Sequence, residues 1–213
     1  MPIFQQHQVD TVRWAVWQIS ENEAQLRLLF PFSQIEEAQL QQFTAPHRRL
    51  EWLAVRALLY TLSGKYLKID YNDNGKPYIA DGSYHISISH TKGYAAVILS
   101  PDSEVGIDIE QYGRRVEKVT SHYLREDERP TAYEGDQVWS LLLHWSAKET
   151  IYKCLNLLEV DLIKHLRIYP FQVQKEGVFR AAEYRTPQQH EYDIHYRLHP
   201  DFVLTYTWIQ NSF

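Results

Sequence analysis

The residues best suited to chemistry begin with two carboxylates, Asp108 and Glu110, which are separated by one residue. The run Val105–Glu110 alternates apolar and acidic residues, which predicts a strand end that buries Ile107 and Ile109 on one face. The two carboxylates would then share the other face and repel each other. A divalent cation between them would remove that repulsion. A solvated strand edge before a loop is the simpler alternative.

A second group of reactive side chains lies on a long helix predicted over Asp136–Leu158, which contains no Pro or Gly and repeats apolar residues at helical spacing. Trp145, Glu149 and Lys153 step by four along one stripe, so an aromatic ring, an anion and a cation are presented together. Lys148 lies about 100° around the helix from Glu149. The alternative for Glu149 and Lys153 is an ordinary surface ion pair that supports the helix.

Composition limits the classes of protein that this chain can be. The 213 residues are 44% hydrophobic and 14% aromatic, as in a folded protein of one large domain or two smaller ones. A net charge of −5 argues against nucleic-acid binding as the main task, so an anionic ligand would need a local basic cluster. The single Cys154 cannot form an internal disulfide, Met1–Asp10 shows no signal pattern, and no apolar run could span a membrane. We therefore expect a cytoplasmic protein.

Candidate anion-binding residues lie upstream of the carboxylates. A helix predicted over Pro46–Ser63 carries Arg48 and Arg49. Lys76 lies on the exposed connection after a predicted hairpin turn, and His90 ends a predicted strand. Each also has a structural explanation, namely a solvated helix face, a loop lysine and a packed histidine.

The predicted elements follow an α+β order that occurs twice, in residues 1–110 and again in 111–213. Two Ser-x-x-Glu capping boxes, Ser20–Glu23 and Ser33–Glu36, predict helix starts. The predicted strands are Thr11–Ile19, Leu67–Tyr71, Pro77–Ala80, Tyr84–Ser89, Tyr94–Leu99, Leu166–Val173, Val178–Tyr184, Tyr192–Leu198 and Phe202–Ile209. The boundary near residues 111–113 separates the Asp108 strand from the Glu149 helix, so a site drawing on both would lie at the interface of the halves.

Taken in order, these residues resemble the paired signature of the 4′-phosphopantetheinyl transferases, in the longer single-chain type related to surfactin synthetase activators. The two main motifs are Gly106–Glu110 and Trp145–Lys153. Gly75–Pro77 and Ser87–Thr91 are similar to that family's Gly-Lys-Pro and Asn-Ile-Ser-His-Ser elements. The resemblance covers roughly Arg48 to Lys153. Departures are Ser87 for Asn, Thr91 for Ser, Thr150 for Ser or Ala, and no Gly-rich segment after Lys153, which bears on the shape of the pantetheine tunnel.

The resemblance implies two similar α+β halves related by a pseudo-twofold axis. It also implies a holo-carrier-protein synthase that moves phosphopantetheine from coenzyme A to a serine of an apo acyl or peptidyl carrier protein and releases adenosine 3′,5′-bisphosphate. Mg²⁺ would be held by Asp108, Glu110 and Glu149 together with the substrate diphosphate. Glu149 is the predicted base toward the carrier serine, directly or through water. Lys153 would neutralise the α-phosphate or the leaving group.

The resemblance assigns further residues to coenzyme A. Lys76, His90 and Ser89 would hold its 3′-phosphate or diphosphate. Arg49 would assist. Arg48 is the alternative, and the sequence does not decide between the two arginines. Lys148 is given a weaker role in phosphate contact.

Two other functions remain open from the sequence: a non-catalytic carrier-binding protein of the same fold, and a magnesium-dependent phosphohydrolase of small diphosphates. We expect a monomer. Because three converging carboxylates would repel, we also expect Asp108→Ala to leave the metal-free protein as stable as the parent or more stable.

Overall fold

The structure is a computed structural model that describes residues 3–155, 157 and 159–210. Its elements in chain order are β1 (Ile3–Val9), β2 (Val12–Gln18), α1 (Glu23–Arg27), α2 (Gln34–Leu40), α3 (Pro46–Ser63), β3 (Ile69–Tyr71), β4 (Pro77–Ile79), β5 (His85–Thr91), β6 (Tyr94–Ser100), β7 (Ser103–Gln111), the 3₁₀ helix η1 (Arg114–His122), α4 (Val138–Leu155), β8 (Leu166–Ile168), β9 (Glu176–Glu183), β10 (Glu191–His199) and β11 (Phe202–Gln210). Among the described residues, no helix has the length and apolar character needed to cross a bilayer.

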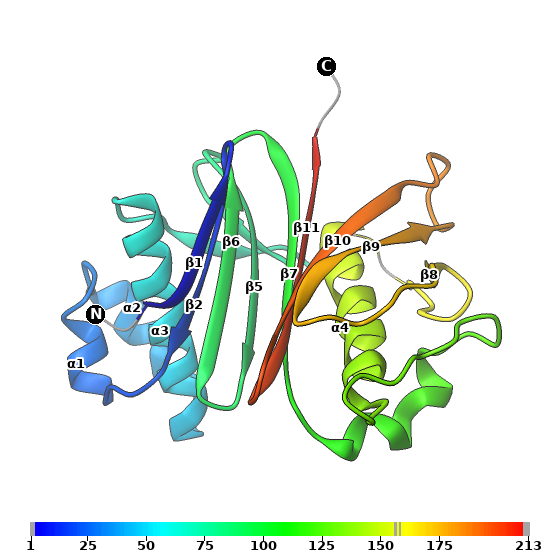
Figure 1. Cartoon of the computed structure of the whole chain (residues 1–213). Coiled ribbons are helices and arrows are strands. Elements are labelled where there is room, and N and C mark those ends of the chain that lie inside the picture. The colour runs from blue at the N-terminus through cyan, green and yellow to red at the C-terminus, as the bar shows by residue number, and fades with distance from the viewer. Residues whose placement is uncertain (1–2, 156, 158, 211–213) are drawn as a thin grey trace.

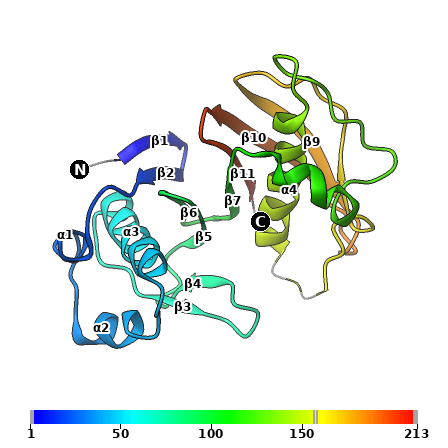
Figure 2. The same ribbon diagram turned by 90° about the horizontal axis from the view of Figure 1, so that it is seen from below.

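Two antiparallel sheets form the centre of the fold. The first has the strand order β1-β2-β6-β5 and the second has the order β7-β11-β10-β9-β8. Helices α1 to α3 lie on the outer side of the first sheet and α4 on the outer side of the second (Figures 1 and 2). Apolar side chains fill the space between each sheet and its helices, and a third cluster from β2, β6, β7 and β11 fills the space between the sheets. The mixed helix and sheet content agrees with the α+β prediction.

Strand β7 joins the two sheets. It precedes the boundary predicted after residue 110, yet it pairs along its length with β11 of the second sheet. Toward β5 of the first sheet, three β7 amides donate hydrogen bonds to side-chain hydroxyls at 3.1 to 3.3 Å. The pairs are Ile107 with Ser87, Ile109 with Ser89, and Gln111 with Thr91.

Local sequence signals placed both ends of α3 and the start of α2. Helix α3 begins at Pro46 and ends before Gly64, whose φ of 72° is one that glycine adopts readily. The Ser33–Glu36 capping box is present. The box predicted at Ser20 is wrong, because Asn22 caps α1 together with Gln25. The predicted end of α4, Leu158, lies outside the described residues.

Strand boundaries were predicted less completely. Strands β9, β10 and β11 lie close to their predicted ranges, whereas β8 is limited to Leu166–Ile168. Strand β1 was not predicted. Its polar sequence, IFQQHQV, pairs with β2 at the edge of the first sheet, where one face is left to solvent.

Candidate active site

Asp108 lies at the centre of the site, on the face of β7 opposite Ile107 and Ile109, which are buried between the sheets. Its carboxylate is 3% exposed. It accepts hydrogen bonds from Ser89 Oγ at 2.9 Å, Ser146 Oγ at 2.7 Å and Lys153 Nζ at 2.7 Å. Asp108 is therefore fixed by contacts from both β5 and α4.

These contacts change the stability expected of Asp108→Ala. Removal of the carboxylate would take one acceptor from each of two hydroxyls and an ammonium, and the loss of hydrogen bonds at buried polar groups is unfavourable. Repulsion among the carboxylates is only one of the terms that Asp108→Ala would change. We now expect the variant to be less stable than the parent.

Glu110 lies two residues after Asp108 on β7 and is hydrogen-bonded to Trp145 of α4. The indole Nε1 donates to Glu110 Oε1 at 2.8 Å. Burial, together with the charge of Asp108, raises the pKa of Glu110 to about 7. Without a cation, ionised Glu110 is thus unfavourable in the folded protein.

Glu149 shows the same effect from α4. Burial, and next the charge of Asp108, raises its pKa above the ordinary value, while Lys153 opposes the change. The charge of Glu149 also raises the pKa of Glu110. The pKa of Glu110 is therefore raised by both other carboxylates, and that of Glu149 by Asp108.

The donor set suits magnesium, since carboxylate oxygens are its preferred protein ligands. Within the described ranges, no three or more His, Cys, Asp or Glu side chains are grouped so that they could hold a metal ion. Lys153 Nζ lies against Asp108, and the ammonium offsets part of the negative charge of the carboxylates. One or two carboxylates suffice for a hydrated Mg²⁺ that completes its shell with substrate oxygens.

Lys153 of α4 contacts strand β7 rather than a partner on its own helix. Its Nζ donates to Asp108 Oδ1 and to the Ile107 carbonyl at 3.1 Å, and its side chain is 25% exposed. The contact with Asp108 differs from the surface pair with Glu149 that the helix spacing left open. Part of the ammonium thus remains available to a ligand.

Gly106 sets the distance between β7 and α4, and sequence reasoning assigned it no role beyond the motif. A Cβ added at this position would collide with the Thr150 carbonyl and lie 2.7 Å from Cys154 Sγ. Only glycine permits this approach. The close approach brings Asp108 within hydrogen-bonding reach of Ser146 and Lys153.

A buried hydroxyl network behind Asp108 was also missed. The Thr205 hydroxyl on β11 is hydrogen-bonded to the Ser146 hydroxyl at 2.8 Å and to the Thr150 hydroxyl at 2.7 Å. Ser146 in turn donates to Asp108. Ser146 and Thr150 are part of the Trp145–Lys153 motif, but the partner on β11 is distant in sequence and carries no local signal.

A cleft of about 500 Å³ lies in the N-terminal half, lined by residues of α3 and by His90 of β5. Arg48 and His90 meet there, with Arg48 Nη1 and His90 Nε2 separated by 3.1 Å and Glu51 beside both. Burial lowers the pKa of His90. Trp52 and Tyr71 add aromatic surface to the lining. The cleft thus combines cationic and aromatic groups, which suit a nucleotide.

Lys76 lies in a neighbouring cavity of about 220 Å³ that Lys153 also lines. Its Nζ contacts Glu104 and the Cys154 carbonyl, each at 3.3 Å. Gly75 and Pro77 line both this cavity and the cleft, so the two spaces adjoin. Ser89, by contrast, is 8% exposed and both bonds of its hydroxyl are made to β7.

The structure does not bring Arg49 or Lys148 to the site. Arg49 forms an ion pair with Glu23 at 2.7 Å and donates to the Leu40 carbonyl, on the side of α3 that faces α1 and α2. Lys148 is fully buried and pairs with Glu128 at 2.9 Å. Both cations are occupied by protein partners, so Arg48 replaces Arg49 as the candidate phosphate ligand and Lys148 is not one.

Comparison with known proteins agrees with this geometry. The sequence model of the 4′-phosphopantetheinyl transferase superfamily matches residues 104–207, which contain all three carboxylates. The 4′-phosphopantetheinyl transferase AcpT of Escherichia coli O157:H7 is 30% identical over 151 residues, covering 66% of this chain and 77% of that protein. The chain belongs to the 4′-phosphopantetheinyl transferase superfamily.

A second relative in the superfamily is AcpT of Salmonella typhimurium, which is 31% identical over 130 residues. The alignment covers 56% of this chain, and the chain spans 66% of that relative's length. The likeness to both relatives therefore extends beyond the short motifs.

A further cavity of about 530 Å³ borders the site on the side of η1. Glu110 and Trp145 line it together with Val116 and Val119 of η1 and with Arg115. Its lining is separate from that of the cleft at His90. Glu110 of this transferase therefore lines an opening that is distinct from the cleft at His90.

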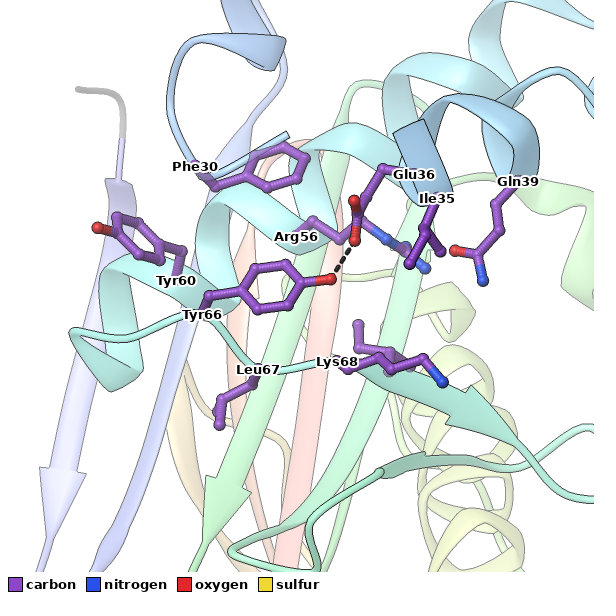
Figure 3. A pocket seen from close by; sticks show the side chains of 10 residues that line it. Phe30, Ile35, Glu36, Gln39, Arg56, Tyr60, Tyr66, Leu67 and Lys68 are labelled. Atoms are coloured by element: carbon purple, nitrogen blue, oxygen red, sulfur yellow. Dashed lines mark hydrogen bonds between the residues drawn. The ribbon is translucent and has the colours of Figure 1, made fainter. Parts of the chain in front are cut away.

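A small pocket under α2 shares Arg56 with the cleft. Figure 3 shows Tyr66 bonded to Glu36, with Arg56 behind them. The pocket holds about 10 Å³, and Arg56 lies 3.3 Å over the ring of Trp52. These groups satisfy each other within the helical layer.

Proposed function

We propose that this chain transfers the phosphopantetheinyl group of coenzyme A to a serine of an apo acyl or peptidyl carrier protein and releases adenosine 3′,5′-bisphosphate. The observation that carries the proposal is a group of three carboxylates and Lys153 beside β7, in which Glu110 lines one opening and Lys153 lines a cavity that adjoins a basic, aromatic cleft. A donor and an acceptor could then approach the same centre from different sides.

In this proposal the cleft holds the nucleotide of coenzyme A. His90 and Arg48 contact the 3′-phosphate, and Lys76 and Lys153 contact the diphosphate from the adjoining cavity. Ser89 positions Asp108 instead of contacting phosphate. Asp108, Glu110 and Glu149 would hold Mg²⁺, which supplies charge neutralisation at the diphosphate when it is bound.

Glu149 is the proposed base for the transfer. The carrier serine oxygen forms a bond to the β-phosphorus, and the bond from that phosphorus to the bridging oxygen breaks. The serine proton passes to Glu149, directly or through water, and the leaving bisphosphate takes the electron pair. A carboxyl whose pKa is raised by burial is suited to accept a proton near neutral pH.

Further parts of the proposal follow from the superfamily. We infer a holo-carrier-protein synthase, a pseudo-twofold relation between residues 1–110 and 111–213, a monomer and a cytoplasmic location. Residues 103–110 pair with the second sheet, so in this view the axis passes near β7.

Mass spectrometry tests the proposed function. Incubation with coenzyme A, Mg²⁺ and a panel of apo carriers should add one phosphopantetheinyl group to a carrier serine. The variant Glu149→Gln, which keeps size and removes the base, should add little. Consumption of coenzyme A with no change in any carrier mass would support a phosphohydrolase, and binding of carriers with coenzyme A left intact would support a non-catalytic protein.

A further inference from the structure

Lys148 and Glu128 form an ion pair on the side of α4 away from the carboxylates, and both side chains are 0% exposed. Lys148 Nζ lies 2.9 Å from Glu128 Oε2 and also donates to the carbonyls of Tyr123 at 2.6 Å and Leu162 at 3.1 Å. An ammonium has three donors, so all are used. Removal of one partner would leave the other charge buried without compensation.

Glu128 is equally committed. Its Oε2 accepts from the Arg125 amide at 2.9 Å and its Oε1 accepts from the Ile168 amide at 2.7 Å. Through Lys148 and Glu128, the chain before α4, the chain after it and the edge strand β8 are gathered onto the helix that carries Glu149.

Tyr123 links this ion pair to the site. Its ring is fully buried, its hydroxyl donates to the Leu141 carbonyl at 3.3 Å, and its own carbonyl accepts from Lys148. The ring meets that of Trp145 edge to face, with centroids 5.3 Å apart. Trp145 then donates to Glu110. The contacts are continuous from Lys148 to a carboxylate of the site.

We propose that Lys148 is a positioning residue, which holds Tyr123 against α4 and thereby fixes the Trp145 indole and the Glu110 carboxylate. The inference rests on the proposed function, in which Glu110 binds magnesium. If Tyr123 is released, Trp145 loses the ring that limits its rotamers, and the hydrogen bond that orients Glu110 weakens. Loss of such an outer partner commonly weakens metal binding tenfold to a hundredfold, and we expect about tenfold here.

The test replaces both partners, Lys148→Met with Glu128→Gln, so that no unpaired charge is buried. Thermal unfolding is followed during Mg²⁺ titration at saturating coenzyme A, with no carrier present. The Mg²⁺ concentration that gives half of the stabilisation should rise about tenfold. Phe179→Leu serves as the control, because it weakens the same core but contacts Phe171 and Tyr196 instead of Trp145. Its Mg²⁺ midpoint should match the parent's.

Two more variants separate positioning from general stability. In a Trp145→Phe background, which lacks the indole donor, the double substitution should add no further rise in the midpoint. Tyr123→Leu keeps the carbonyl acceptor but removes the ring, so it should raise the midpoint as the double variant does, and it provides the answer if that variant does not fold.

An unchanged midpoint in the folded double variant or in Tyr123→Leu would overturn the inference, since a purely structural role lowers the unfolding temperature alone. A full, additive effect in the Trp145→Phe background would overturn it as well. A parent protein that gains no stability from Mg²⁺ and coenzyme A would refute the proposed function itself, and with it the inference.

Discussion

The raised pKa of Glu110 makes a quantitative prediction about the metal-free protein. The folded carboxyl has a pKa of about 7 against an ordinary value of 4.5. Between these values the folded state binds more protons than the unfolded state, so stability falls as pH rises through this window. The difference corresponds to about 3 kcal/mol, lost by pH 8 and retained below pH 4.5. Glu110→Gln removes the ionisation while its amide oxygen can still accept from Trp145.

Thermal unfolding with a chelator present measures the effect. We expect Glu110→Gln to unfold about 6–12 °C above the parent at pH 8 and close to it at pH 4.5. Glu117→Gln, at an exposed position on η1, is the matched control and should follow the parent. Parallel curves for the parent and Glu110→Gln between pH 5 and pH 8 would refute the argument. With Mg²⁺ and coenzyme A added, the parent should recover more stability than the variant.

Three further outcomes are expected. Gly106→Ala should lose about 1–3 kcal/mol of stability and most transfer activity, because its Cβ meets a backbone carbonyl. The control Gly113→Ala has open space around its Cβ, so thermal unfolding should show no loss of stability and carrier mass assays no loss of activity. Asp108→Ala should unfold at a lower temperature than the parent, and an equal or higher value would restore the repulsion argument. His90→Ala should raise KM for coenzyme A more than it lowers kcat, and dephospho-coenzyme A should narrow that gap; an unchanged gap would return His90 to a structural role.

The sequence predicted those parts of the site that depend on local periodicity. Alternation over Val105–Glu110 correctly placed Ile107 and Ile109 in a core and the carboxylates on the other face. The four-residue spacing on α4 correctly grouped Trp145 and Glu149 beside β7, because helix geometry fixes which side chains share a face.

Periodicity could not predict which basic side chains lie at the site and which pair with other parts of the protein. Arg48 and Arg49 are neighbours on one helix, and only the tertiary packing of α1 puts Glu23 against Arg49 and leaves Arg48 at the cleft. Lys148 is buried because Glu128 reaches it from an irregular connection, whose path no pattern specifies. Long-range pairing thus decides which charges are free to bind a ligand.

The pairing of β7 with β11 has a consequence for the order in which the protein matures. Strand β7 spans residues 103–111 and its partner spans 202–210, so the closure of this ladder joins segments that a ribosome releases far apart in time. Thr205 on β11 also completes the hydroxyl network that supports Ser146 and Thr150. Contacts of such long sequence separation form late and slowly. A nascent chain should therefore remain unable to assemble its three carboxylates until β11 has been synthesised, and shortening the chain within β11 should abolish the site while the N-terminal helices still form.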